Sequence, residues 1–386
     1  MNRFASRTGP IRLGMVGGGR GAFIGAVHRI AARLDGEFEL VAGALSSTPE
    51  KAQASGRELG LAEDRTYDDF AAMAKREARL EDGIEAVAIV TPNHMHLAPA
   101  REFLKRGVHV ICDKPLTATL AEARRLADAA ERSGALFMLT HTYTGYPMAR
   151  QAREMVAAGE LGEIRVVQVE YAQDWLAETP DPANKQAEWR TDPARSGLGG
   201  ATGDIGTHAF NLLRFVTGLG VEALAAELRS FAPGRRLDDD AHVLMRFEGG
   251  ARGALWCSQV ASGEENGLRL RVYGTKAGLS WSQETPNELW VTPIGGPARR
   301  LTRGGGGTGA AAARVTRVPA GHPEGFLEAF ANLYAEAARA IRARRDGATP
   351  PDEVIFPTVR DGLEGVAFVD ACVRSSKRDA AWVTLG

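Results

Sequence analysis

The sequence predicts an α/β protein of two domains, a doubly wound parallel sheet followed by an α+β domain. The chain has 386 residues, which is more than one hydrophobic core usually organises. Strand-like and helix-like segments alternate over the first third of the chain. Later strand-like segments alternate apolar and polar residues, as in a mostly antiparallel or mixed sheet with one buried face.

The first domain is expected to span residues 1–141 and the second residues 142–386. In the first, strands are expected at residues 11–16, 38–45, 84–90, 107–112 and 135–140. Residues 84–90 are almost entirely apolar, which suits burial on both faces of a parallel sheet. In the second, residues 164–171, 243–247 and 268–273 alternate in polarity, and Glu248–Gly250 suits a hairpin turn.

The glycine-rich segment after the first strand predicts a dinucleotide site. Gly17 permits a tight turn, and Gly19 lets the backbone approach a pyrophosphate that faces the amides of the following helix. Ala22 completes the fingerprint G-x-G-x-x-A, although Gly25 could take the third place in a longer loop. The residues assigned to this end of the cofactor are Gly17, Gly19, Ala22, Phe23 and Ile24.

Other polar residues follow the remaining strands, and ligands of such sheets bind outside the carboxyl ends of the strands. We therefore expect one crevice to hold Ser46, Thr91, Pro92, Asn93, His96, Asp113 and Lys114. The second strand ends at Ser46 without an acid to select NAD and without an adjacent Arg to select NADP, and Lys51 lies a helical turn away. The residues alone leave both cofactors open.

The composition excludes several classes of protein. Lys and Arg total 47 and Asp and Glu 48, so nothing indicates nucleic-acid binding. No apolar run has membrane-spanning length, and residues 1–10 lack a secretory core. Three dispersed cysteines and the lack of zinc-ligand spacing favour a reducing cytoplasm and no metal site. Two basic clusters are interpreted as solvated surface: Arg299, Arg300 and Arg303, and Arg342, Arg344 and Arg345.

Four motifs occur in order along nearly the whole chain. They are the glycine-rich turn ending near His28, Thr91-Pro92-Asn93-x-x-His96, Asp113-Lys114-Pro115 and Gly203-Asp204-x-x-x-His208. In them the sequence resembles the glucose–fructose oxidoreductase / inositol dehydrogenase / rhizopine-catabolism (Gfo/Idh/MocA) family, in which Glu usually replaces Asp113. The resemblance implies a Rossmann domain, a second domain with a large open sheet, NAD as the favoured cofactor, and a homodimer or homotetramer assembled through that sheet.

The resemblance also assigns a role to Lys114, which matches the family lysine beside the nicotinamide and the reacting hydroxyl. An ammonium at a buried strand end can orient the substrate oxygen and stabilise developing negative charge. The alternative is a lysine that extends into solvent after an edge strand.

Asp204 and His208 are the predicted acid–base pair. A helix over residues 204–215 would place them on one face at positions i and i+4. Histidine as a residue type suits a general base at neutral pH, so His208 is the candidate, and Asp204 would orient it or bind a neighbouring hydroxyl. The residues alone favour a helix cap and a buried histidine, whereas the family motif favours catalysis.

The remaining substrate candidates lie near strand ends or turns. They are Tyr143, Tyr171, Arg190 and His322, with Asp174, Trp175 and Trp189 nearby. Arg190 would set specificity, although a surface salt bridge explains it equally well, and Glu324 beside His322 could serve only the helix dipole. Relatives often have basic residues where Thr144 and Gly145 stand, so part of the usual contact set is replaced. Residues 304–313 are interpreted as a mobile loop, solvated by default, with a lid or a subunit contact as the alternatives.

The predicted function is NAD(P)-dependent oxidation of a hydroxyl of a cyclic polyol or sugar, such as an inositol or a pyranose. An NAD-retaining glycosidase or epimerase-like enzyme on the same fold is the main alternative. A non-catalytic cofactor-binding regulator is a third, which the intact Lys114, Asp204 and His208 disfavour.

Overall fold

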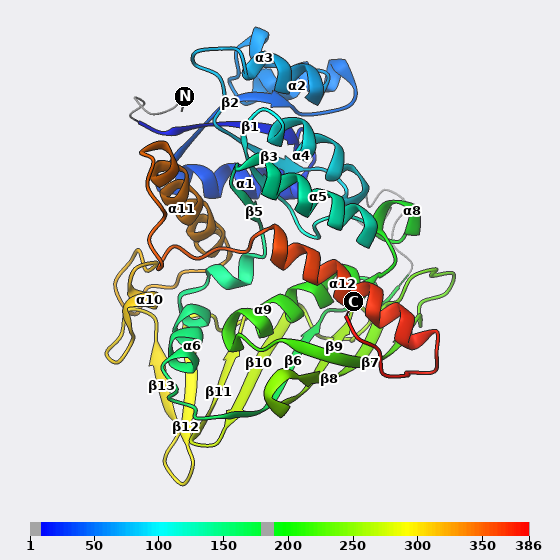
Figure 1. Cartoon of the computed structure of the whole chain (residues 1–386), viewed down its shortest axis with the longest axis vertical. Helices are drawn as coiled ribbons and strands as arrows, with labels where there is room; N and C mark the ends of the chain where they lie inside the picture. Colours follow the sequence, from blue (N-terminus) through cyan, green and yellow to red (C-terminus); the bar gives the residue numbers. More distant parts are fainter. Residues whose placement is uncertain (1–8, 179–188, 386) are drawn as a thin grey trace. The chain divides into compact units, whose positions relative to one another are not determined.

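The computed structural model describes residues 9–178 and 189–385 (Figure 1). These residues form two compact units. The first consists of residues up to 117, 121–142 and 326–363, and the second of residues 118–120, 143–325 and 364 onward.

The first unit is built on a parallel sheet with strand order β2-β1-β3-β4-β5. Its strands are β1 (Ile11–Gly17), β2 (Phe38–Ala44), β3 (Ala86–Val90), β4 (His109–Cys112) and β5 (Phe137–Leu139). Its helices and short turns are α1 (Phe23–Leu34), α2 (Pro49–Glu58), η1 (Glu63–Arg65), α3 (Phe70–Glu77), η2 (Asn93–Met95), α4 (Leu97–Leu104), α5 (Leu120–Ser133) and α11 (Phe326–Arg345). Every residue of β3 is buried, as its apolar sequence predicts.

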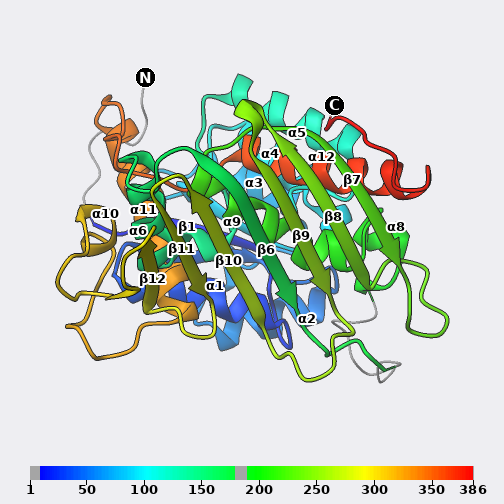
Figure 2. The ribbon, with the colours of Figure 1, turned by 90° about the horizontal axis from the view of Figure 1, so that it is seen from below.

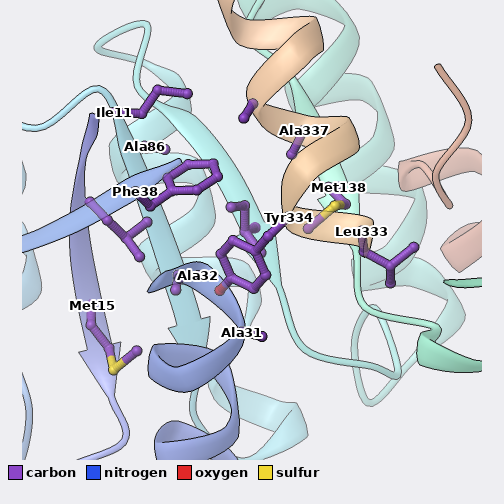
Figure 3. Packing of buried hydrophobic residues seen from close by; sticks show 14 of the residues in the cluster. Ile11, Met15, Ala31, Ala32, Phe38, Ala86, Met138, Leu333, Tyr334 and Ala337 are labelled. Carbon is purple, nitrogen blue, oxygen red and sulfur yellow. The ribbon is translucent and has the colours of Figure 1, made fainter. Parts of the chain in front are cut away.

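Helix α11 belongs to this first unit, although the sequence placed it in the second domain. Tyr334 and Ala337 on α11 pack with Ala31 and Ala32 on α1 in the main hydrophobic cluster (Figure 3). The small alanines allow the two helices to approach closely. A single boundary at residue 141 is therefore wrong, because residues 326–363 return to the first unit.

The second unit is built on a sheet with strand order β13-β12-β11-β10-β6-β9-β8-β7. These strands are β6 (Ile164–Ala172), β7 (Val221–Arg229), β8 (Asp240–Phe247), β9 (Arg252–Ser258), β10 (Gly267–Gly274), β11 (Ala277–Ser282), β12 (Glu288–Pro293) and β13 (Arg299–Thr302). Only β6 and β9 pair in parallel among the paired strands of this sheet in the described chain. The predicted mostly antiparallel sheet is confirmed, as is the turn Glu248–Gly250 between the antiparallel strands β8 and β9.

Helices of the second unit cover one face of this sheet, and Figure 2 shows the strands from the opposite side. The helices and turns are η3 (Thr142–Gly145), α6 (Pro147–Ala157), α8 (Pro193–Ser196), a π-helical turn η4 (Thr202–Gly206), α9 (Thr207–Thr217), η5 (Glu248–Gly250), α10 (Ala310–Ala313) and α12 (Val359–Ser376), which crosses from the first unit. Alternate residues of β8 are buried and exposed.

Two interpretations of surface segments are correct only in part, because Arg299, Arg300 and Arg344 are exposed as expected but other members of these segments are not. The loop over residues 304–313 contains α10, and the backbone amide of Gly309 donates to Gln151 of α6 at 2.6 Å. Arg303 is only 2% exposed, and the buried Arg345 donates to the buried Glu85 at 2.5 Å. A basic cluster looks solvated in the sequence because its acidic partners lie far along the chain.

Candidate functional site

In the first unit, the carboxyl ends of β1, β2 and β3 border a cavity of about 450 Å³. Its lining includes six residues predicted to bind the cofactor: Gly17, Gly19, Ala22, Ser46, Thr91 and Pro92. Lys51, an exposed residue of α2, lines the same cavity. Phe23 instead faces a neighbouring hollow and is 66% exposed, and Ile24 packs against the hydrophobic cluster.

The glycines explain why the chain turns so tightly beside this cavity. Gly17 and Gly18 have φ angles of 79° and 73°, which favour glycine. A Cβ on Gly25 would lie 2.4 Å from the Cα of Gly18. Gly25 is therefore the residue that permits close packing of the helix, and Ala22 lies in the loop before it. This glycine cradle before a helix start, with the Ser46 hydroxyl, fits a dinucleotide.

Asn93 and His96 are buried beside this region. The ring nitrogens of His96 lie 2.9 Å from the carbonyl oxygen of Pro115 and 2.8 Å from that of Thr91. Burial lowers the pKa of His96. Since both nitrogens face backbone carbonyls, this geometry suits holding two loops together rather than direct contact with a cofactor.

Asp113 and Lys114 follow β4, which lies between β3 and β5 in the sheet. The alternative interpretation of Lys114, a lysine that extends into solvent after an edge strand, therefore does not apply, because β4 is not an edge strand. Asp113 accepts a hydrogen bond from Thr140 at 2.8 Å, and His28 lies 3.9 Å from the same carboxylate. Burial by itself raises the pKa of Asp113, but the interaction with His28 and the charge of Lys114 outweigh burial and bring it to about 2. Asp113 is therefore a permanent anion beside Lys114.

His141 is a neighbour of Lys114 that the sequence analysis missed. It is buried, and burial together with the charge of Lys114 lowers its pKa to about 3. Its position directly after a strand was the signal that could have found it. A neutral imidazole here can accept or donate a hydrogen bond without adding positive charge.

In the second unit, Asp204 lies in the π-helical turn η4, and α9 begins only at Thr207. The predicted α-helix over residues 204–215 is therefore wrong at its start, and ideal i, i+4 geometry does not apply to Asp204 and His208. Asp238 holds this turn, because its carboxylate accepts hydrogen bonds from the amides of Gly200 and Thr202, both at 2.7 Å.

The carboxylate of Asp204 is held by two side chains. Gln259 donates to its Oδ2 at 3.0 Å, and Nε of Arg190 lies 3.3 Å from the same oxygen. The guanidinium of Arg190 also lies 4.3 Å from the ring centre of Trp189. Arg190 therefore forms a salt bridge with Asp204, the predicted catalytic carboxylate. Gln259 was missed because an uncharged residue after a strand carries no distinctive signal.

His208 lies among the predicted substrate tyrosines. Its ring centre is 4.8 Å from that of Tyr143, in an edge contact, and 6.3 Å from that of Tyr171. The two tyrosine hydroxyls are hydrogen-bonded to each other, and Tyr171 donates to Asn266 at 2.7 Å. Burial raises the pKa of both tyrosines, and the nearby charge of Asp204 raises it further. The second unit thus brings together Tyr143, Tyr171, Asp204 and His208, with Arg190.

His322 is placed differently. Its side chain is exposed, and its carbonyl oxygen accepts a hydrogen bond from Arg303. Within residues 9–178 and 189–385, the ring contacts and hydrogen bonds that connect His208, Tyr143 and Tyr171 do not involve His322.

Comparison with known proteins gives the family. Residues 11–141 match the model of the oxidoreductase family with an NAD-binding Rossmann fold, and residues 149–280 match the Gfo/Idh/MocA C-terminal domain. The crystal structure of an oxidoreductase from Sinorhizobium meliloti is 63% identical, with a TM-score of 0.90 over 98% of this chain and 100% of that one. The chain belongs to the Gfo/Idh/MocA family. It is an NAD-binding oxidoreductase.

Other relatives carry more specific names. The structure of an inositol dehydrogenase homologue from Azotobacter vinelandii with NAD+ is 40% identical, with a TM-score of 0.94 and 98% of each chain covered. That homologue has also been solved with NADH and myo-inositol. The levoglucosan dehydrogenase of Pseudarthrobacter phenanthrenivorans is 27% identical over 97% of each chain. In the described part of this chain, no helix is long and apolar enough to cross a membrane.

Proposed function

We propose that this oxidoreductase oxidises a hydroxyl of a cyclic polyol or a pyranose with NAD. The observation that carries the proposal is the cluster in the second unit, where His208 lies against Tyr143 and Tyr171, and where Arg190 and Gln259 hold Asp204. Phenolic hydroxyls, a carboxylate and an imidazole are groups that bind polyhydroxylated rings. Relatives named for myo-inositol and levoglucosan support this substrate class.

The proposed roles follow from the chemistry of each residue. Bound along Gly17, Gly19, Ser46 and Thr91, NAD supplies the hydride acceptor. His208 removes the proton of the reacting hydroxyl, and Lys114 orients its oxygen and stabilises the negative charge that develops on it. Asp204, held by Arg190 and Gln259, orients His208 or a neighbouring substrate hydroxyl.

A screen of the purified chain tests this function. With NAD and a panel of inositols, aldoses and glycosides, we expect reduced nicotinamide to appear, measured by absorbance, with at least one inositol or pyranose. NADP is run in parallel because Lys51 lines the cofactor cavity. Chemical change of a glycoside without net NADH would favour the NAD-retaining alternative, and NAD binding without any turnover would favour the regulator.

We further propose that two or four copies assemble in the cytoplasm through the open face of the large sheet. Leu244, Tyr273 and Trp290 are exposed on its strands, and a hollow of about 470 Å³ on this face is lined by Leu244, Trp256 and Trp382. Apolar side chains grouped on one face are typical of an interface. Three buried free cysteines accord with a reducing compartment.

Leu244→Lys is expected to weaken this assembly at least about tenfold, since it would bury an unpaired charge in the interface. Analytical ultracentrifugation over a concentration series measures the change. Phe231→Lys is the matched control, because Phe231 is a similarly exposed apolar residue outside the strands. Equal assembly of both variants would show that the sheet face is not the interface.

A further inference from the structure

A chain of hydrogen bonds links an indole at the edge of the second unit to the tyrosine beside His208. Trp175 Nε1 donates to Gln173 Oε1 at 3.0 Å, and Gln173 Nε2 donates to Asn266 Oδ1 at 2.8 Å. Tyr171 reaches the same Asn266 oxygen at 2.7 Å, and its hydroxyl also bonds that of Tyr143. The direction of each bond decides what Tyr143 can offer to a ligand.

The direction is set at the Trp175 end. An indole N–H can only donate, so the Gln173 atom that faces it must be the carbonyl oxygen. The amide nitrogen of Gln173 then faces Asn266, and the Asn266 atom that receives it must be Oδ1. One donor-only group therefore orients both amides.

The same logic orients the two tyrosines. A carbonyl oxygen carries no proton, so Tyr171 must donate its single hydroxyl proton to Asn266. The bond between the two hydroxyls must then use the proton of Tyr143. Burial raises the pKa of both phenols, so each keeps its proton at neutral pH.

A second branch agrees with this assignment. Asn266 Nδ2 donates to Gln283 Oε1 at 3.0 Å, and Gln283 Nε2 lies 3.2 Å from the hydroxyl of Tyr146. This branch is compatible with the assignment but does not fix it, because the Gln283 amide can turn and the Tyr146 hydroxyl can donate or accept. The donor-only indole of Trp175 is what sets the direction.

We infer that this one-way chain makes the Tyr143 hydroxyl acceptor-only, so that it selects a substrate offering a hydroxyl hydrogen at that position. The inference rests on the proposed function, because it places the substrate ring beside His208, whose ring centre is 4.8 Å from that of Tyr143. A methyl ether or a fluorine at the matching position presents lone pairs against lone pairs and is rejected. Asn266, Gln173 and Trp175 thus determine specificity through Tyr143.

The test uses the NAD-loaded full chain with myo-inositol and the sets of mono-O-methyl and monodeoxyfluoro inositols. Fluorine is close in size to a hydroxyl but cannot donate a hydrogen bond. For the unchanged protein, kcat/KM is expected to fall at least about tenfold when fluorine occupies one particular ring position besides the reacting one. In Tyr171→Phe, the hydroxyl of Tyr143 no longer donates to Tyr171 and can donate to the substrate. The fall in kcat/KM caused by fluorine at that ring position should therefore shrink about tenfold, while the effects of fluorine at other positions persist.

Gln173→Glu provides a second and sharper variant. A carboxylate accepts hydrogen bonds only, so Asn266 must turn its Nδ2 towards residue 173 and Tyr171. Tyr171 then donates to Tyr143, and Tyr143 can donate to the substrate. In this variant, kcat/KM for the same fluoro analogue should rise about tenfold relative to that for myo-inositol. Every aromatic ring of the cluster is retained. Binding to the NADH-loaded protein, measured by calorimetry, should change in the same direction.

Tyr146→Phe is the matched control, because the Tyr146 hydroxyl receives the end of the second branch and is not a link between Trp175 and Tyr143. Its removal should keep the positional penalty. Oxidation of myo-inositol with equal tolerance at every position, or an unchanged penalty in both Tyr171→Phe and Gln173→Glu, overturns the inference alone. If the protein neither binds nor oxidises any inositol or pyranose, the proposed function is overturned together with the inference.

Discussion

His208→Ala is expected to lower kcat by about 10²–10⁴-fold, the usual contribution of a positioned general base, while NAD affinity stays within about twofold. Lys114→Ala is expected to lower kcat by about 10²–10³-fold, because it removes a charge that stabilises the developing negative oxygen. Steady-state rates on the best polyol from the screen give kcat. Quenching of protein fluorescence by NADH gives the cofactor affinity.

Added imidazole distinguishes catalysis from a structural role of His208. It should restore part of the rate of His208→Ala in proportion to its concentration, because a free base can occupy the space of the lost ring. Lys105→Ala is the control for Lys114, since Lys105 is an exposed lysine paired with Glu102. Near-normal rates in both His208→Ala and Lys114→Ala would remove the proposed catalytic assignment.

The sheet of the first unit was predictable because the apolar character of each strand can be read from consecutive residues. Strands buried on both faces must be apolar along their length, and β3 (Ala86–Val90) is. Residues that follow such strands then fall at one edge of the sheet, which is why Ser46, Thr91 and Pro92 line the cofactor cavity as expected.

The start of the Asp204 segment was not predictable because a distant residue shapes it. Asp238 holds Gly200 and Thr202 from more than thirty positions downstream, and the chain adopts a π-helical turn there. Nothing within residues 204–208 signals this departure from an α-helix. The place of α11 is similar, since an amphipathic helix shows that it has a buried face but not which partner covers it.

The neutral residues of the site were missed for a related reason. Gln259 and Asn266 carry no charge, and each follows or precedes a strand among many similar polar residues. Their importance lies in the partners that they contact, Asp204 and Tyr171, which only the folded chain brings to them. Sequence motifs therefore identified candidates for the chemistry but not the residues that position them.

Arg303→Ala is expected to destabilise the second unit by about 3–5 kcal/mol, because it leaves the buried Glu324 without its cationic partner. Arg303 donates to Glu324 at 3.0 Å, to Asn287 at 2.8 Å and to the carbonyl oxygen of Val318 at 2.6 Å. Both side chains of the ion pair are almost fully buried. Tryptophan fluorescence during urea unfolding measures the effect selectively, since all six tryptophans belong to the second unit.

Arg300→Ala is the matched control, because Arg300 lies on β13, which ends at Thr302 just before Arg303, and forms an exposed ion pair with Glu288 at 3.0 Å. Exposed pairs contribute little, so this change should cost no more than about 1 kcal/mol. The two arginines are three positions apart and chemically identical, and only burial and the number of hydrogen bonds separate them. If Arg303→Ala unfolded at the same urea concentration as Arg300→Ala, the Arg303 network would contribute nothing to stability, and its burial would need another explanation.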